Sequence, residues 1–380
     1  MTGPTPQRRS TGMGAFFNDD YKARPNLTLN LGVRYELDRP IADRYDKIGN
    51  FMTAHGQTVI PHRGAMPGLD PLLEMTQMTG RIGFADELGY PRSMVYTDYT
   101  NLAPRAGFAW RPRGTVRAVV RGGYGIFYTG YLLNPIRNSL QNQFPFVFTE
   151  TYSRNASYPE RVTFSNPFPP EIRSLGGVTN ANGFEVRPAT GYLQSYNLTI
   201  ERDLGAGMVL EAGFVGSKGS HLGRIGDINI PRRNVEAYQA AVPTQQLRPY
   251  PFVNGAINMY SFGVNSIYNS GQISLRRRSR SGTFYRLNYS FSKTIDGASQ
   301  LSGTSNGGYS GFQDPDNHRL ERGRSDFDIR HNITGNGLYE LPFGKGKAFA
   351  ANVPGWADQI IGGWQVSTIM RYRSGLPTTI

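Results

Sequence analysis

The chain contains no cysteine among its 380 residues, so disulfide bonds and thiolate metal sites are excluded. It also has no uninterrupted apolar run of about 18 residues, which excludes a transmembrane helix. A membrane-spanning β-strand is not excluded by this absence. Its lipid-facing and water-facing residues alternate, so that its average hydropathy is unremarkable.

Motifs for catalysis and for cofactor binding are missing as well. The five histidines are dispersed and have no metal-binding spacing. The string GTSNG at 303–307 matches the nucleophile-elbow pattern around Ser305, but it lies in a Gly/Ser-rich loop instead of between a strand and a helix. A secreted carbohydrate-binding protein or hydrolase is a weak alternative, because no recognisable motif supplies paired carboxylates. We therefore expect no enzyme and no cofactor.

An acidic segment, QDPDNHRLERGRSDFD at 313–328, contains oxygen ligands of the kind that Ca²⁺ prefers. They are Asp314, Asp316, Asn317 and Asp326. The segment lacks the glycine and the bidentate glutamate of an EF-hand loop. We expect a solvated loop whose charges are partly paired with one another.

The net charge of +13 is explained either by a solvated basic surface or by nucleic-acid binding. The basic residues are scattered, and LRRRSR at 275–280 is the one dense cluster. We expect no nucleic-acid partner, because no DNA- or RNA-binding motif appears. Anionic lipid headgroups explain the charge equally well.

What the chain has in abundance is glycine (46 residues) and aromatic side chains (22 Tyr and 21 Phe). The stretch NLTLNLGVRYELD at 26–38 alternates apolar and polar residues throughout, as a β-strand with one apolar face does. At about 3.3 Å per residue and a tilt of about 45°, such a strand rises about 30 Å. That height is enough to cross an apolar band of about 25 Å. In a soluble β-sandwich the two sheets are only about 10 Å apart, and strands of this length would add no further stability.

Four strand pairs joined by tight Gly- or Pro-containing turns are predicted, and a fifth pair is joined by a longer connection. Their ranges are 14–22 with 26–38, 103–111 with 115–128, 191–203 with 208–218, 268–279 with 283–293, and 328–341 with 363–376. The links between the pairs, 39–102, 129–190, 219–267 and 294–327, are expected to be structureless. Short turns at one end and long links at the other are typical of an antiparallel transmembrane β-barrel with periplasmic turns and extracellular loops.

On this fold the polar residues of the strands face the barrel lumen. The candidates for ligand contact are Arg34, Glu36, Arg117, Arg121, Glu201, Arg286, Arg371 and Arg373. Two interpretations stay open: these side chains pair with one another or with a plug domain, or their excess of arginine favours anionic solutes. Aromatic girdles at the membrane borders are expected from Phe16, Phe17, Tyr35, Tyr124, Phe127, Tyr128, Tyr285 and Tyr289.

The segment FFNDDYKARPNLTLNLGVRYE at 16–36 resembles a conserved block of TonB-dependent outer-membrane receptors of the Oar-like group. Further blocks follow in the family's order: NLAPRAGFAWRP, RGGYGIFY, YNLTIERDL, VGSKGSHL, LNYSFSKTID, DFDIRHNITGNGLYELPFGKGK and GGWQVSTIMRYRSGLP. The resemblance implies a barrel of about 22 strands, an N-terminal plug domain, and ligand import energised through the TonB protein.

The chain departs from that plan, because it supplies about ten strands and shows no signal peptide, TonB box or plug. We therefore expect a poorly ordered stretch at 1–13 and a partial receptor barrel at 14–380, without plug and final strands. The expected location is the bacterial outer membrane. The expected partners are its lipid, the receptor's own missing plug, TonB through the missing N-terminal region, and an unknown extracellular ligand. A passive barrel or a surface adhesion protein is the alternative.

Overall fold

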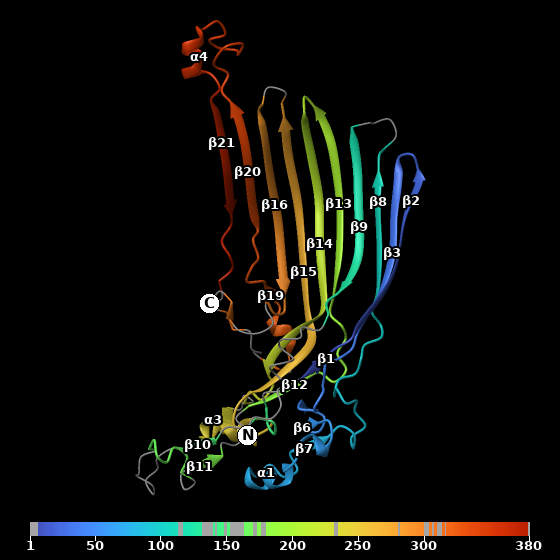
Figure 1. The fold of residues 1–380 in the computed structure, drawn as a ribbon, viewed down its shortest axis with the longest axis vertical. Helices are drawn as coiled ribbons and strands as arrows, with labels where there is room; N and C mark the ends of the chain where they lie inside the picture. Colours follow the sequence, from blue (N-terminus) through green and yellow to red (C-terminus); the bar gives the residue numbers. More distant parts are fainter. Residues whose placement is uncertain are drawn as a thin grey trace.

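Ten long strands form one antiparallel sheet that runs in chain order from β2 to β21 (Figure 1). The computed structural model describes residues 7–112, 117–130, 140, 143–147, 150–152, 163–169, 173–175, 180–231, 235–279, 282–299, 304–305, 308–309, 314–315 and 317–378. The ten strands are β2 (Gly12–Arg24), β3 (Leu27–Asp38), β8 (Leu102–Trp110), β9 (Ala118–Tyr128), β13 (Tyr192–Gly205), β14 (Met208–Asp227), β15 (Ile257–Arg278), β16 (Phe284–Asp296), β20 (His331–Glu340) and β21 (Gln365–Arg373). The prediction of an all-β antiparallel fold with five hairpins is confirmed.

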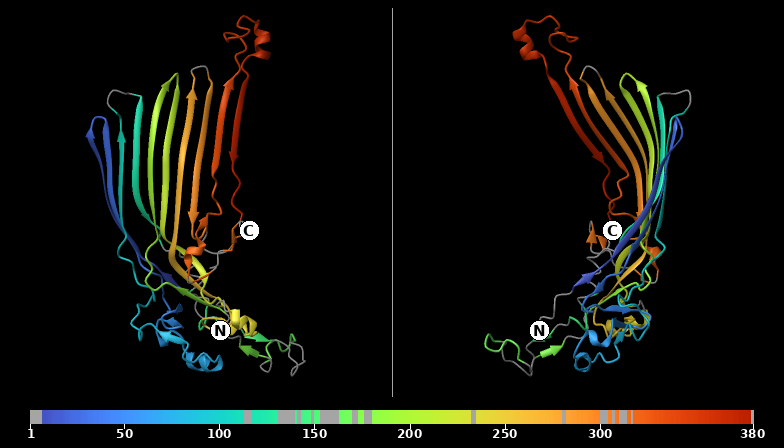
Figure 2. Two further views of the ribbon diagram at one scale, coloured as in Figure 1. Left: turned by 180° about the vertical axis from the view of Figure 1, so that it is seen from behind. Right: turned by 45° about the vertical axis from the view of Figure 1, so that its right-hand side comes forward.

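The sheet is curved, with β2 and β21 at its two edges (Figure 2). All five hairpin connections lie at one end, which we call the turn end (Figure 1). The four links 39–101, 129–191, 228–256 and 297–330 lie toward the other end, the loop end. The β20–β21 connection is the longest of the hairpin connections and carries α4 (Gly355–Ile361). The predicted separation of turns from links is confirmed.

The turn between β13 and β14 is formed by three residues in the left-handed region of backbone conformation. Gly205, Ala206 and Gly207 all have positive φ angles, of 85°, 51° and 72°. A Cβ atom on Gly207 would lie 2.1 Å from the carbonyl oxygen of Arg278 in β15. Only glycine accommodates both the positive φ and this close approach at position 207.

The links are not structureless, and that expectation is wrong. The first contains a three-stranded sheet of β5 (Asn50–Met52), β6 (Gln57–Ile60) and β7 (Ile82–Phe84), and also α1 (Leu69–Met75). In the second, β12 (Ala181–Phe184) pairs in parallel with the first residues of β15. The third is shorter than predicted because β14 and β15 extend to 20 and 22 residues. Among the described residues, no helix is long and apolar enough to cross a membrane.

The buried apolar side chains are concentrated at the loop end, in three clusters. The largest combines residues of the first link, such as Met52 and Met94, with Leu140 and Phe184 of the second and Tyr260 of β15. Phe184 stacks on Tyr260 with ring centroids 5.0 Å apart. We call this packed unit, built from the first three links and the adjoining ends of β14 and β15, the loop layer. It is a hydrophobic core that does not depend on membrane lipid.

Within the segment 1–13, the described residues include two strand regions. The short strand β1 (Arg8–Arg9) pairs with β4 (Ala42–Asp43) in the first link, and β2 begins at Gly12 instead of at residue 14. The N-terminal residues thus connect the edge of the sheet to the loop layer.

Candidate functional site: two faces and a cationic pocket

The hydrogen-bonding register assigns every strand residue to one of two faces, because directly paired residues project to the same side of a sheet. Starting at Leu29, the register traces one row across the sheet. Its members are Leu29, Phe108, Gly122, Leu198, Phe214, Gly271 and Phe291. This side, to which the leucines of β3 belong, is the apolar face.

Among the described residues of the strands from β3 to β21, the charged side chains of the apolar face lie only near its two ends. Arg202 and Arg277 lie near the turn end, and Lys218 and Lys293 lie near the loop end. Along β15, Arg277 is eight residues from Asn269, the partner of Lys293. Eight residues rise about 20 Å at a tilt of about 40°. The band between Arg277 and Lys293 is therefore about 20 Å high, close to the apolar band of about 25 Å in outer-membrane barrels.

The opposite side of the sheet is the polar face. One of its rows contains Thr28, Ala109, Arg121, Thr199, Gly213, Gln272, Ser290, Asn332 and Arg373. All eight residues predicted for the lumen belong to this face: Arg34, Glu36, Arg117, Arg121, Glu201, Arg286, Arg371 and Arg373. The structure thus gathers them on one surface, although it spreads them over several strands.

Half of these eight residues take part in ion pairs. Glu201 lies between two arginines, with Arg121 Nη1 at 3.3 Å and Arg276 Nη2 at 3.6 Å from its two carboxylate oxygens. Arg34 pairs with Glu36 on the same strand. Arg117, Arg286, Arg371 and Arg373 form no ion pair with the described residues. The polar face therefore keeps an excess of positive charge.

The aromatic residues divide between the faces. Phe17, Tyr35, Tyr124, Tyr128, Tyr285 and Tyr289 lie on the apolar face, and at the loop end Tyr128 packs against Tyr192 with ring centroids 5.7 Å apart. Phe16 and Phe127 lie on the polar face, so their expected place in an aromatic girdle is wrong. Phe127 instead packs beneath the guanidinium of Arg105, 4.6 Å from its ring centroid.

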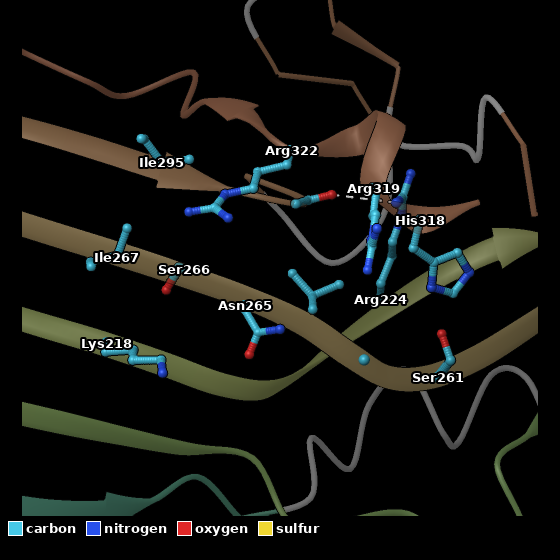
Figure 3. Close-up of a pocket in the computed structure, with 13 residues that line it drawn as sticks. Lys218, Arg224, Ser261, Asn265, Ser266, Ile267, Ile295, His318, Arg319 and Arg322 are labelled. Carbon is cyan, nitrogen blue, oxygen red and sulfur yellow. Dashed lines mark hydrogen bonds between the residues drawn. The ribbon is translucent and has the colours of Figure 1, made fainter.

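A cavity of about 600 Å³ lies at the loop end of β14, β15 and β16, beside the short helix η4 (His318–Glu321) (Figure 3). Its lining consists of Lys218, Arg224, Ser261, Gly263, Val264, Asn265, Ser266, Ile267, Ile295, Gly297, His318, Arg319 and Arg322. Where the chain is described, the lining includes four side chains that carry a permanent positive charge and no carboxylate. We call it the cationic pocket.

The acidic segment beside this pocket is more buried than predicted. Arg224, 3% exposed, pairs with Glu321 at 3.3 Å and donates to the carbonyl oxygen of Gly297. Asp328, fully buried, accepts hydrogen bonds from Arg324 and from the backbone N–H of Thr294. Self-pairing is confirmed, but full solvation is wrong, because β16 and the fourth link pack together here.

The structure gives little support to the other candidate sites in this region. Asp316, one of the proposed oxygen ligands, lies outside the described residues, as does the side chain of Ser305. Where the chain is described, no three His, Cys, Asp or Glu side chains gather in a way that could hold a metal ion.

Two polar side chains fasten the loop layer. Fully buried Asn50 donates to the carbonyl oxygen of Phe184 at 3.0 Å and accepts from its N–H at 2.7 Å, as a paired strand residue would. Asp98 accepts hydrogen bonds from Thr100 and from the backbone N–H of Thr190, in the next link. Burial raises the pKa of Asp98, but these hydrogen bonds stabilise the carboxylate more and hold the pKa below its usual value.

A family model described as an outer membrane beta barrel domain matches residues 2–380. The chain belongs to this family. As a member of it, the chain is a component of the bacterial outer membrane, and its apolar face is the side exposed to lipid. Comparison with the curated proteins gives no match.

Several solved structures resemble this outer-membrane barrel. The outer membrane transporter YddB from Escherichia coli is 12% identical and has a TM-score of 0.45, covering 96% of this chain and 38% of its own. The alcaligin receptor FauA from Bordetella pertussis is 11% identical (TM-score 0.36; 90% and 36% covered). The FrpB iron transporter from Neisseria meningitidis (F3-3 variant) is 10% identical (TM-score 0.34; 88% and 41% covered). The chain spans about two fifths of the length of these proteins.

Proposed function

We propose that this chain forms part of the wall of a TonB-dependent outer-membrane receptor that imports an extracellular ligand. The observation that carries the proposal is the division of the sheet into two faces. From β3 to β21, the described strand residues of one face carry no charge between its two ends. The other face carries all eight predicted contact residues, and six of them are arginines. A barrel wall with lipid on one side and a hydrated, cationic lumen on the other is suited to a protein that lets solutes cross the membrane.

The edges of the sheet indicate what else the receptor contains. Unpaired N–H and C=O groups along β2 and β21 would be costly in lipid, where no water can satisfy them. Further strands therefore complete the barrel. The block-by-block resemblance to Oar-like receptors supports a plug domain inside the barrel and contact with TonB through an N-terminal region, as opposed to a passive pore.

The excess of arginine on the polar face favours ligands that carry negative charge. Arg286 and Arg371 have no ion-pair partner among the described residues, so their charge is available to a solute. Glu201 is already neutralised by two arginines and contributes little repulsion.

The test is uptake by cells that express the full-length protein, with and without TonB. Uptake of an anionic solute that requires TonB supports energised import. Uptake that is indifferent to TonB would instead identify a passive barrel, and adhesion without uptake would identify a surface protein. The double variant Arg286→Gln/Arg371→Gln should reduce the preference for anions. Arg202→Gln, which removes a charge from the apolar face, should leave the preference unchanged.

A further inference from the structure

The cationic pocket lies where the apolar face ends. Lys218, Ile267 and Ile295 are paired across β14, β15 and β16, so they form one row of the apolar face. All three line the pocket. Lys293 belongs to the adjacent row toward the turn end and marks the border of the charge-free band. These three residues place part of the pocket's lining on the side of the wall that lipid contacts, at the height where membrane hydrocarbon gives way to headgroups.

The positive charge of the pocket is largely unbalanced. Lys218, Arg319 and Arg322 form no ion pair with the described residues. Glu321 is committed to Arg224, and buried Asp296 accepts hydrogen bonds from Ser299. Three cations, one on β14 and two on the fourth link, with no carboxylate among the described lining residues, form a site for a group with more than one negative charge.

The arrangement of the side chains suits a ligand with one charged end and one apolar end. Figure 3 shows Arg319 and Arg322 approaching β15 from the fourth link, whereas Lys218 projects from β14 on its other side. Val264, Ile267 and Ile295 supply apolar surface between these cations. A charged headgroup held by the cations would leave its apolar portion beside the lipid-facing wall.

We propose that the cationic pocket binds a phosphate monoester carried by a membrane lipid. A phosphate monoester has a charge of about −1.5 to −2 at neutral pH and three acceptor oxygens, which suits a pocket lined by several cations. Basic clusters at a membrane surface attract anionic headgroups. Lipid held here would clamp the fourth link to the wall. The proposal requires the membrane location but not import, so it goes beyond the proposed function.

The experiment uses the full-length protein in phosphatidylcholine nanodiscs with and without phosphatidic acid, whose headgroup is a phosphate monoester. Lipid retained after mild detergent extraction is counted by native mass spectrometry. We expect the wild type to retain phosphatidic acid selectively. Arg322→Gln and Lys218→Gln should each weaken retention about tenfold, the loss expected for one charge-assisted contact. The variant Arg322→Lys keeps the positive charge, so it should retain most of the phosphatidic acid that the wild type retains.

The matched control is Arg202→Gln, which removes an exposed cation from the same face at the turn end, away from the pocket. Its lipid retention should equal that of the wild type. Equal retention by Arg322→Gln and the wild type would overturn the proposal. So would displacement of phosphatidic acid by inorganic phosphate at matched concentration, because the pocket would then take its phosphate from solution. Heat-modifiable migration in a detergent gel checks that each variant is folded, and Arg319→Gln replaces any that is not.

Discussion

A single strand can test which face of the sheet contacts lipid. Leu198 on β13 lies on the apolar face, four residues from Arg202 and four from Gln194, whose row contains Lys218. On β13 and β14 it therefore lies midway between the nearest cations of the apolar face, Arg202 and Lys218, about 10 Å from each. Leu198→Arg should destabilise the folded barrel by about 2–4 kcal/mol, the cost of an arginine at the bilayer midplane. The measurement is urea-dependent unfolding in phospholipid vesicles.

Two neighbouring positions serve as controls for this prediction. Thr199→Arg places the same charge one residue away on the polar face and should change stability by less than about 1 kcal/mol. Gln194→Arg stays on the apolar face but at its loop-end border, where the expected cost is about 0–1 kcal/mol. Equal costs at 198 and 199 would refute the assignment of the faces, and equal costs at 198 and 194 would refute the position of the band.

Two further predictions concern the loop layer. Asn50→Leu removes both hydrogen bonds to the buried backbone of Phe184 and should lower the free energy of local opening by about 3 kcal/mol. The measurement is hydrogen exchange of the Phe184 amide, which should become faster. An unchanged exchange rate would contradict the prediction. Because the folded pKa of Asp98 is lowered, its stabilising effect is fully present above its unfolded pKa of about 3.9 and is lost as the pH falls through the lower folded value. Limited proteolysis of the first link should therefore accelerate below about pH 4 in the wild type, whereas Asp98→Asn should be cleaved faster at neutral pH and depend less on pH across that window.

The strands and their faces were predictable because each strand meets two different solvents. Lipid on one side and water on the other impose strict alternation, and the alternation of Leu27 to Leu37 is visible without any tertiary information. The eight predicted contact residues share a face for the same reason. Their ion pairs were not predictable, because Arg121 and Glu201 lie 80 residues apart and meet only through the register of β9 and β13.

The loop layer was missed because its core has no single period. Met52, Met94 and Phe184 come from different links and are buried together only in three dimensions. One local signal was available: Leu69, Leu72 and Leu73 have the spacing of a helix with one apolar side, and they are the buried residues of α1. The cationic pocket had no such signal, because Lys218 and Arg322 come to line the same pocket only after β14, β15 and the fourth link are in place.

The shared core of the loop layer implies an order of assembly. Its largest cluster needs residues of the first link, the second link and β15 at once, and β12 completes it by pairing with β15 in parallel. Contacts so distant in sequence cannot consolidate before the intervening hairpins are positioned. We therefore expect the strands from β3 to β15 to be in place before the loop layer, which covers one end of the wall, consolidates.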